Sequence, residues 1–333
     1  AAGGESSQPF LQYIALLRMR HHLIAFAILL LPITLQAQDD LLSLLGEDTS
    51  VILTTASFKA TRVINSNSIE NTAHGVLDFR ISHRFGELSS GVEELYGLDQ
   101  ATIRLGLDYG ITDRLMVGLG RSSYQKTIDV FAKYKILRQC DQGCSMPITL
   151  SLATGSSLTT LAAENVPWYG EGRTDYFTHR LAYYFQLIAG RKFSENLTLQ
   201  IMPGLVHRNL VRTTAEENDV INIGGAGRYK LTKRLAINAE YFYVLPDQLA
   251  EPQTPTDLTY YNSFSLGFDI ETGGHVFQLH CTNSAGMFER GFITETTGNW
   301  LDGDIRFGFN ISRVFTVHDP KAKAKEKVKE EKW

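Results

Sequence analysis

Apolar residues occupy every second position over long stretches of this chain. One clear example consists of Ala101, Ile103, Leu105, Leu107 and Tyr109, which are separated by single polar or small residues. Successive side chains of a β-strand point to opposite faces, so each stretch has one apolar and one polar face. The alternation predicts twelve strands, at residues 75–87, 100–109, 114–122, 126–138, 147–156, 176–190, 197–207, 219–230, 234–245, 262–271, 275–283 and 302–315.

The connections between these strands fall into two classes of length. Three are tight turns, at 110–113, 231–233 and 272–274. Five are long, at 88–99, 157–175, 208–218, 246–261 and 284–301. Outer-membrane barrels have short periplasmic turns and longer extracellular loops. We therefore predict an all-β fold, a closed antiparallel transmembrane β-barrel of about 12 strands, with 10 or 14 strands as alternatives. A soluble β-sandwich or lipocalin-like barrel is the competing interpretation.

An export signal favours the membrane. A short basic stretch at Met19–His22 precedes an apolar run at Leu23–Leu35, and Ala37 offers a small residue for cleavage. This pattern predicts a signal peptide over 19–37, with residues 1–18 as an upstream extension outside the fold. The apolar run is too short to span a bilayer as a helix. We expect the mature protein to lie in the outer membrane.

Two segments flank the predicted barrel of residues 74–315. The first, 38–73, begins with a candidate short helix at 38–46, and its part 51–73 is either an extra strand pair or a segment that enters the lumen. The second, 316–333, is a charged tail that we expect to be solvated in the periplasm. Both are candidate contacts for a periplasmic partner. The other expected partners are the lipid bilayer and the barrel-assembly machinery, which would act on the last strand ending at Phe315.

Composition excludes several classes of protein. Hydrophobic residues make up 43% of the chain and charged residues 20%, which is too apolar for a disordered chain. The net charge of −4 argues against a nucleic-acid binder. Cys140 and Cys144 lie close enough in sequence to form a disulfide in an oxidising compartment, in a periplasmic turn. Two cysteines are too few for a zinc site, so we expect no metal and no cofactor, and we expect Cys281 to face lipid unpaired.

The polar faces of the strands are the candidate functional surface, because they line the lumen if the apolar faces meet lipid. The candidate wall residues are Arg80, Arg84, Arg104, Asp108, Asp129, Lys133, Arg180, Arg228, Glu240, Asp269, His280 and Arg306. Acidic and basic residues are nearly balanced, whereas a strongly ion-selective pore has one sign in excess. The charges either pair and partly fill the interior or line a narrow channel for small polar solutes. A non-conducting barrel that scaffolds partners is the alternative.

Catalysis is a third hypothesis, and the sequence gives it little support. An outer-membrane hydrolase would need a nucleophile within hydrogen-bond reach of a base. His83 and His179 are predicted on the outward face, but neither has a serine two residues away on its strand. The chain contains no G-x-S-x-G or H-E-x-x-H motif. We therefore expect no enzyme and no catalytic residues.

Several stretches resemble an uncharacterised family of Gram-negative outer-membrane β-barrels, a β-barrel domain of unknown function. They are Ile81–Gly86, Gly97–Arg114, Gly118–Ser123, Gly274–Ser284 and Phe307–Phe315. The resemblance covers about 40–315 and implies a fold and a location. It implies no activity and no catalytic residues, and the Cys140–Cys144 pair is not a feature that it explains.

Overall fold

The computed structural model describes residues 51–166, 174–249 and 258–318. Several predictions lie outside these residues. They are the upstream extension 1–18, the signal peptide 19–37, the short helix at 38–46 and the tail beyond residue 318.

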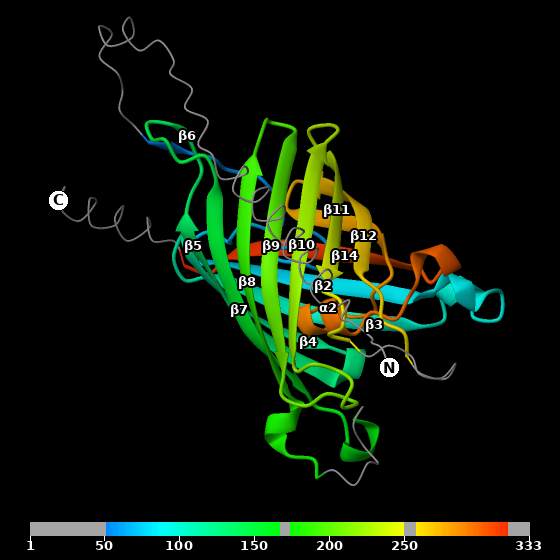
Figure 1. The fold of residues 1–333 in the computed structure, drawn as a ribbon. Coiled ribbons are helices and arrows are strands. Elements are labelled where there is room, and N and C mark those ends of the chain that lie inside the picture. Colours follow the sequence, from blue (N-terminus) through cyan, green and yellow to red (C-terminus); the bar gives the residue numbers. More distant parts are fainter. Residues whose placement is uncertain (1–50, 167–173, 250–257, 319–333) are drawn as a thin grey trace, which may run out of the picture. The chain divides into compact units, whose positions relative to one another are not determined.

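Twelve antiparallel strands form one closed barrel (Figure 1), so the predicted fold class is confirmed. The strands are β2 (Val76–Glu87), β3 (Ala101–Gly110), β4 (Leu115–Ser122), β5 (Thr127–Leu137), β7 (Thr149–Thr159), β8 (Leu181–Lys192), β9 (Leu197–Arg208), β10 (Asp219–Lys230), β11 (Leu235–Val244), β12 (Ser263–Thr272), β13 (His275–Thr282) and β14 (Arg306–Thr316). Each strand pairs with its neighbour in the chain, and β14 closes the barrel on β2 with Ile311 opposite Ile81.

The two ends of the barrel differ as predicted in most of their connections. The exceptions are the short connection 123–126 between β4 and β5 and the long connection 138–148 between β5 and β7. Tight turns at 111–114, 193–196, 231–234 and 273–274 lie at one end, where β2 begins and β14 ends. The connections 88–100, 160–180, 209–218, 245–262 and 283–305 lie at the other end. In outer-membrane barrels the end with short turns faces the periplasm. We call the two ends periplasmic and extracellular on this basis.

The barrel has an apolar outside and a largely polar inside. Exposed side chains on the outer face include Leu105, Leu107, Phe185, Ile201 and Leu279. The alternate positions on the same strands are buried and many are charged, which reverses the arrangement of a water-soluble protein. Among the described residues, no helix is long and apolar enough to cross a membrane.

Two predicted strands begin later than expected, and both lie next to a 3₁₀ turn at the extracellular end. The predicted strand 176–190 begins only at Leu181, because Phe177–Arg180 forms a 3₁₀ turn, η5. The predicted strand 302–315 begins only at Arg306, because Trp300–Asp302 forms a 3₁₀ turn, η6, that ends at Gly303 with φ 82°. Left-handed backbone favours glycine at that position.

The remaining short elements decorate both ends of the barrel. The extracellular loops carry 3₁₀ turns η1 (Leu88–Ser90), η2 (Leu95–Gly97), η3 (Tyr124–Lys126) and η4 (Ala163–Asn165), and the helix α2 (Glu289–Thr294). At the periplasmic end, β1 (Ile52–Leu53) pairs with β6 (Cys140–Gln142) in a separate two-stranded sheet. A disulfide joins Cys140 to Cys144 in the β5–β7 connection, and Cys281 is free on the outer face of β13.

Candidate functional site in the barrel lumen

Two chain segments fill the lumen from opposite ends. From the periplasmic end, residues 57–72 enter the barrel and are almost entirely buried, and we call this segment the plug. From the extracellular end, residues 283–296, which include α2, fold inward and are also almost entirely buried, and we call this segment the inner loop. Of the two alternatives for 51–73, entry into the lumen describes residues 57–72, whereas Ile52–Leu53 forms the short strand β1, which pairs with β6 outside the barrel.

The plug is folded back on itself as a tight loop. Val63 N donates to Ser66 O at 2.9 Å, and Ser68 N donates to Thr61 O at 3.0 Å. The run of asparagine and serine from residue 65 to 68 suits this conformation, because these side chains form local hydrogen bonds that stabilise turns.

Glu240 of β11 binds the tip of the plug. Its carboxylate accepts the backbone N–H groups of Ile64 at 3.3 Å, Asn65 at 2.8 Å and Ser66 at 3.1 Å. It also accepts the Ser66 hydroxyl at 2.7 Å. A buried carboxylate is costly unless its oxygens are hydrogen-bonded, and here the plug supplies four donors.

Two basic wall residues also bind the plug. The ammonium group of Lys133 donates to the backbone oxygens of Thr61 at 3.1 Å, Ser68 at 2.8 Å and Glu70 at 2.6 Å. Arg84 Nη2 donates to Asn65 Oδ1 at 2.7 Å. Glu240, Lys133 and Arg84 of the barrel wall therefore all hydrogen-bond to the plug.

An ion pair joins the plug to the inner loop. Arg62 Nη1 lies 3.0 Å from Glu289 Oε1, and Asn67 Nδ2 donates to the same carboxylate at 2.8 Å. Burial lowers the pKa of Arg62, and the nearby carboxylates of Glu289 and Asp108 raise it. The carboxylates outweigh burial, so the pKa lies above its ordinary value. Arg62 is therefore charged at every physiological pH.

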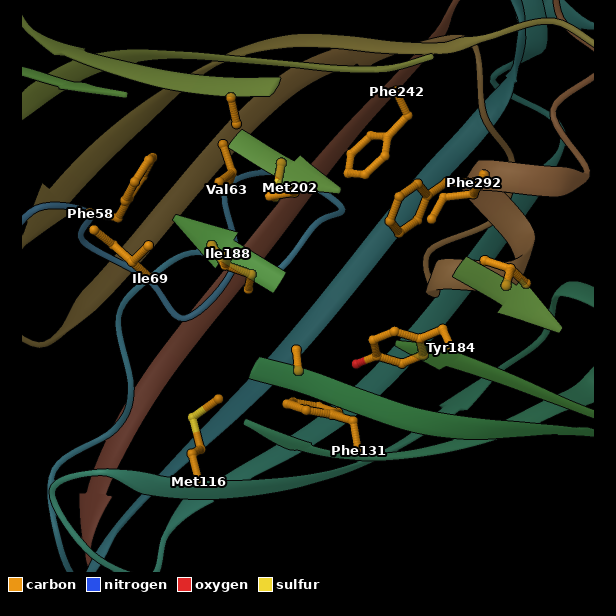
Figure 2. Packing of buried hydrophobic residues seen from close by; sticks show 14 of the residues in the cluster. Phe58, Val63, Ile69, Met116, Phe131, Tyr184, Ile188, Met202, Phe242 and Phe292 are labelled. Atoms are coloured by element: carbon orange, nitrogen blue, oxygen red, sulfur yellow. The ribbon is translucent and has the colours of Figure 1, made fainter. Parts of the chain in front are cut away.

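Apolar side chains also occupy part of the inner wall, which the sequence analysis did not predict. Inward side chains of β4 to β11, including Met116, Phe131, Ile188 and Met202, form a buried cluster. Figure 2 shows Phe58, Val63 and Ile69 of the plug among these wall residues. Phe292 of α2 packs against Phe242 of β11, with ring centroids 5.0 Å apart (Figure 2). The plug is thus held by apolar contacts and by hydrogen bonds from the same strands, because β5 carries both Phe131 and Lys133 and β11 carries both Phe242 and Glu240.

Most of the predicted wall residues lie on the inner face of the barrel. The buried ones are Arg80, Arg84, Arg104, Asp108, Asp129, Lys133, Arg228, Glu240, Asp269 and His280. Arg306 is half-buried at the extracellular rim, where it pairs with Glu87. The prediction that Arg180 lies on a strand is wrong. Arg180 is the last residue of η5, and it forms an ion pair with Asp175 outside the strands.

Several of the wall charges pair with one another rather than point to the centre. Arg104 Nε donates to Asp129 Oδ1 at 2.9 Å, and its guanidinium lies across Gly106 and Gly120 of the wall. Arg80 pairs with Asp78 at 3.2 Å. Glycines allow the long side chain of Arg104 to lie flat against the sheet, because a Cβ atom at Gly120 would meet its guanidinium.

The ion pair between the plug and the inner loop was not predicted from the sequence. Alternation marks strands, and it does not show that Arg62 and Glu289 meet inside the barrel. The one available signal was the polar run 65–71 within an otherwise alternating stretch.

Two of the cavities that the described residues form lie beside the plug and the inner loop. The larger, about 530 Å³, lies at the periplasmic end between the plug and the ends of β2, β13 and β14. The smaller, about 70 Å³, lies at the extracellular end beside Arg208, Tyr260 and Arg290.

The two histidines of the hydrolase hypothesis do not face a nucleophile. His83 lies on the outer face of β2, where its ring stacks on Phe309 with centroids 4.9 Å apart. His179 lies in η5 rather than on an outward strand face, and its ring contacts Tyr176 at 5.1 Å. Over the described ranges, no group of His, Cys, Asp or Glu side chains is arranged to hold a metal ion.

The fold and the filled, polar lumen define a transmembrane β-barrel. Residues 58–315 match the protein family described as "Membrane bound beta barrel domain (DUF5777)". The chain belongs to this family, which confirms the resemblance seen in the sequence, and it is an outer-membrane β-barrel.

Solved structures with a similar fold are porins and channels. The NanC porin is 10% identical with a TM-score of 0.43, over 72% of this chain and 98% of that chain. The KdgM porin is 9% identical with a TM-score of 0.41, over 72% and 99%. The outer membrane channel of Pseudomonas putida F1 is 13% identical with a TM-score of 0.43, over 74% and 98%. Because the identities and TM-scores are low, these structures carry no functional argument for this chain. No curated protein matches the chain.

Proposed function

We propose that the protein is a gated channel for small polar solutes, closed by the plug in the conformation described here. In this proposal the route runs through the lumen, and passage requires the plug to move away from the polar wall. The observation that carries the proposal is the set of buried wall charges that bind the plug, above all Glu240 and Lys133.

The energetic argument compares this wall with an apolar one. Replacing buried charges by well-packed apolar residues is often neutral or stabilising, so a lumen that is always filled gains little from them. Charges on the wall are useful when water and polar solutes replace the plug, because hydrated charged groups then line the route. Twelve strands lie between the eight that leave a filled interior and the sixteen that leave a water channel.

A permanently closed barrel is the second candidate. The observation that favours it is the buried apolar cluster between Phe58, Val63 and Ile69 of the plug and the wall. Such a barrel would act as an anchor for partners. The plug itself is buried, so residues 51–56, which are mostly exposed, are the described part of 38–73 that a periplasmic partner could reach.

Planar-bilayer conductance separates the two candidates. We expect the wild-type protein to open rarely and Glu240→Gln to open more often, because the amide cannot accept all four hydrogen bonds from the plug tip. Glu217→Gln is the matched control, since Glu217 is exposed in the extracellular loop 209–218. Sealed bilayers with folded wild-type and Glu240→Gln proteins would favour the permanently closed barrel.

A further inference from the structure

The cavity at the periplasmic end has the size of a small-molecule site. Its volume of about 530 Å³ falls within the roughly 300–1,000 Å³ that is usual for ligand pockets. It is bounded on one side by the plug, through Phe58, Lys59 and Thr61, and on the other by the barrel wall. The residues that fix the plug tip to Glu240 do not line this space, so the cavity lies apart from the plug tip.

The wall of this cavity presents apolar side chains that face inward. Val76, Val276 and Val314 lie on β2, β13 and β14 at the same alternation as the buried residues Asp78, Gln278 and Ser312. Val314 is nevertheless 57% exposed, because it faces the cavity instead of packed chain. With Phe58 opposite, these valines form a solvent-accessible apolar surface inside the barrel, where an apolar body can be buried.

The charged groups that line the same cavity are mainly acidic. Glu70, Asp78 and Glu271 line it, against the single ammonium of Lys59, which pairs with Glu271 at 2.9 Å. Lys135 pairs with Glu70 at 3.3 Å but does not line the cavity. The lining therefore presents three carboxylates and one ammonium group, while Arg80 and Lys135 pair with Asp78 and Glu70 from outside it.

Asp78 supplies a specific acceptor at the floor of the cavity. The residue is 2% exposed, and its Oδ2 accepts from Arg80 Nη2 at 3.2 Å. The Ser312 hydroxyl, which also lines the cavity, lies beside the same carboxylate, and Oδ1 has no other hydrogen-bond partner within the described part of the chain. Asp108 faces Asp78 in register on β3, so a second carboxylate adds to the negative charge. A buried acceptor without a partner is unfavourable, and a donor group of a ligand relieves that cost.

We propose that this cavity is a periplasmic binding site for a small organic cation, an amine with an apolar body. The ammonium group donates to Asp78, and the apolar body lies against Val76, Val276 and Val314. The site goes beyond the proposed channel, and it is formed with the plug in its place in the lumen.

Titration of the purified full chain with three size-matched probes tests the site. Benzylammonium is expected to bind about tenfold or more tightly than benzyl alcohol, because a charge-assisted hydrogen bond to Asp78 adds to the same apolar contact. Benzoate is expected not to bind. Equal affinity for the three probes, or no binding of benzylammonium, overturns the proposal.

Two variants, Val314→Trp and Asp78→Asn, locate the site, and Val317→Trp is the control. Binding is compared only among variants whose barrel is folded. Val314→Trp places an indole in the cavity and is expected to abolish benzylammonium binding, whereas Val317→Trp, at a residue that is 64% exposed and does not line the cavity, keeps it. Asp78→Asn is expected to weaken benzylammonium binding to the level of benzyl alcohol. Unchanged binding in folded Val314→Trp overturns the assignment. Conductance plays no part in these readouts, so they fail or succeed separately from the channel proposal.

Discussion

Arg62 of the plug and Glu289 of α2 form a buried ion pair inside the barrel, with Nη1 3.0 Å from Oε1. The two side chains are 3% and 2% exposed, and they belong to segments that enter the lumen from opposite ends. The ion pair therefore couples the plug to the inner loop. We predict that loss of either side chain destabilises the buried position of both segments.

A double-mutant cycle measures this coupling. Arg62→Met is expected to lower the free energy of unfolding by about 3–5 kcal/mol, because it leaves the Glu289 carboxylate buried without its counter-charge. Glu289→Gln in the same background is expected to recover much of the loss, since the remaining amide still accepts from Asn67. Urea unfolding in detergent, followed by heat modifiability, gives the values.

The matched control for this cycle is Arg234→Met, because Arg234 is exposed in the turn 231–234. Its expected effect is within about 0.5 kcal/mol. Strictly additive losses for Arg62→Met and Glu289→Gln would show that the pair does not couple the two segments.

Glycines of the wall predict which positions tolerate a side chain. A Cβ at Gly120 would lie 2.2 Å from Arg104 Nη2, and Arg104 is fixed by Asp129. Gly120→Val is therefore expected to cost about 1–3 kcal/mol or to block assembly of the barrel. Gly225→Val is the control, because its side chain would meet no atom within 4 Å on the outer face. Equal yields and equal unfolding midpoints for the two variants would contradict this account of the wall.

The disulfide predicts a defined thiol count. Cys140 and Cys144 are joined, so alkylation of unreduced protein from the envelope is expected to label Cys281 alone. Labelling at all three cysteines before reduction would count against the bond.

Loss of the disulfide is expected to loosen the entrance of the plug. Leu53 pairs with Cys140, and Thr54 N donates to Gln139 O at 2.9 Å, so the disulfide loop holds the residues that precede the plug. Cys144→Ser is expected to weaken this local structure by about 2 kcal/mol, measured as faster amide exchange at 53–54. Cys281→Ser is the control and is expected to change nothing there.

The strands could be predicted from the sequence because their pattern is local. Leu105 and Leu107 mark an outward face whatever lies beyond the strand, and the turn at 111–114 separates two such patterns within a few residues. Alternation gave a wrong strand boundary where a 3₁₀ turn preceded the strand. The alternation appeared to include Arg180, but contacts of the 3₁₀ turn and Asp175 hold it outside β8.

The content of the lumen could not be predicted in the same way. Glu240 contacts residues about 175 positions earlier in the chain, and nothing around either partner identifies the other. The inward apolar residues of β8 to β10, such as Ile188 and Met202, look in sequence like ordinary strand residues. A charged residue on an inner face indicates a polar lumen, but the sequence does not show whether water or the chain itself meets that charge.

Amide hydrogen exchange of the plug tests the central claim most directly. In the folded protein, the N–H groups of Asn65, Ser66 and Ser68 donate to Glu240 or to Thr61 inside the barrel. We predict that peptides covering 61–69 exchange at least about 100-fold more slowly than an unstructured chain, while the exposed residues 55–56 exchange rapidly. Exchange of 61–69 at the unstructured rate, in protein whose barrel strands are protected, would contradict the claim that the plug fills the lumen.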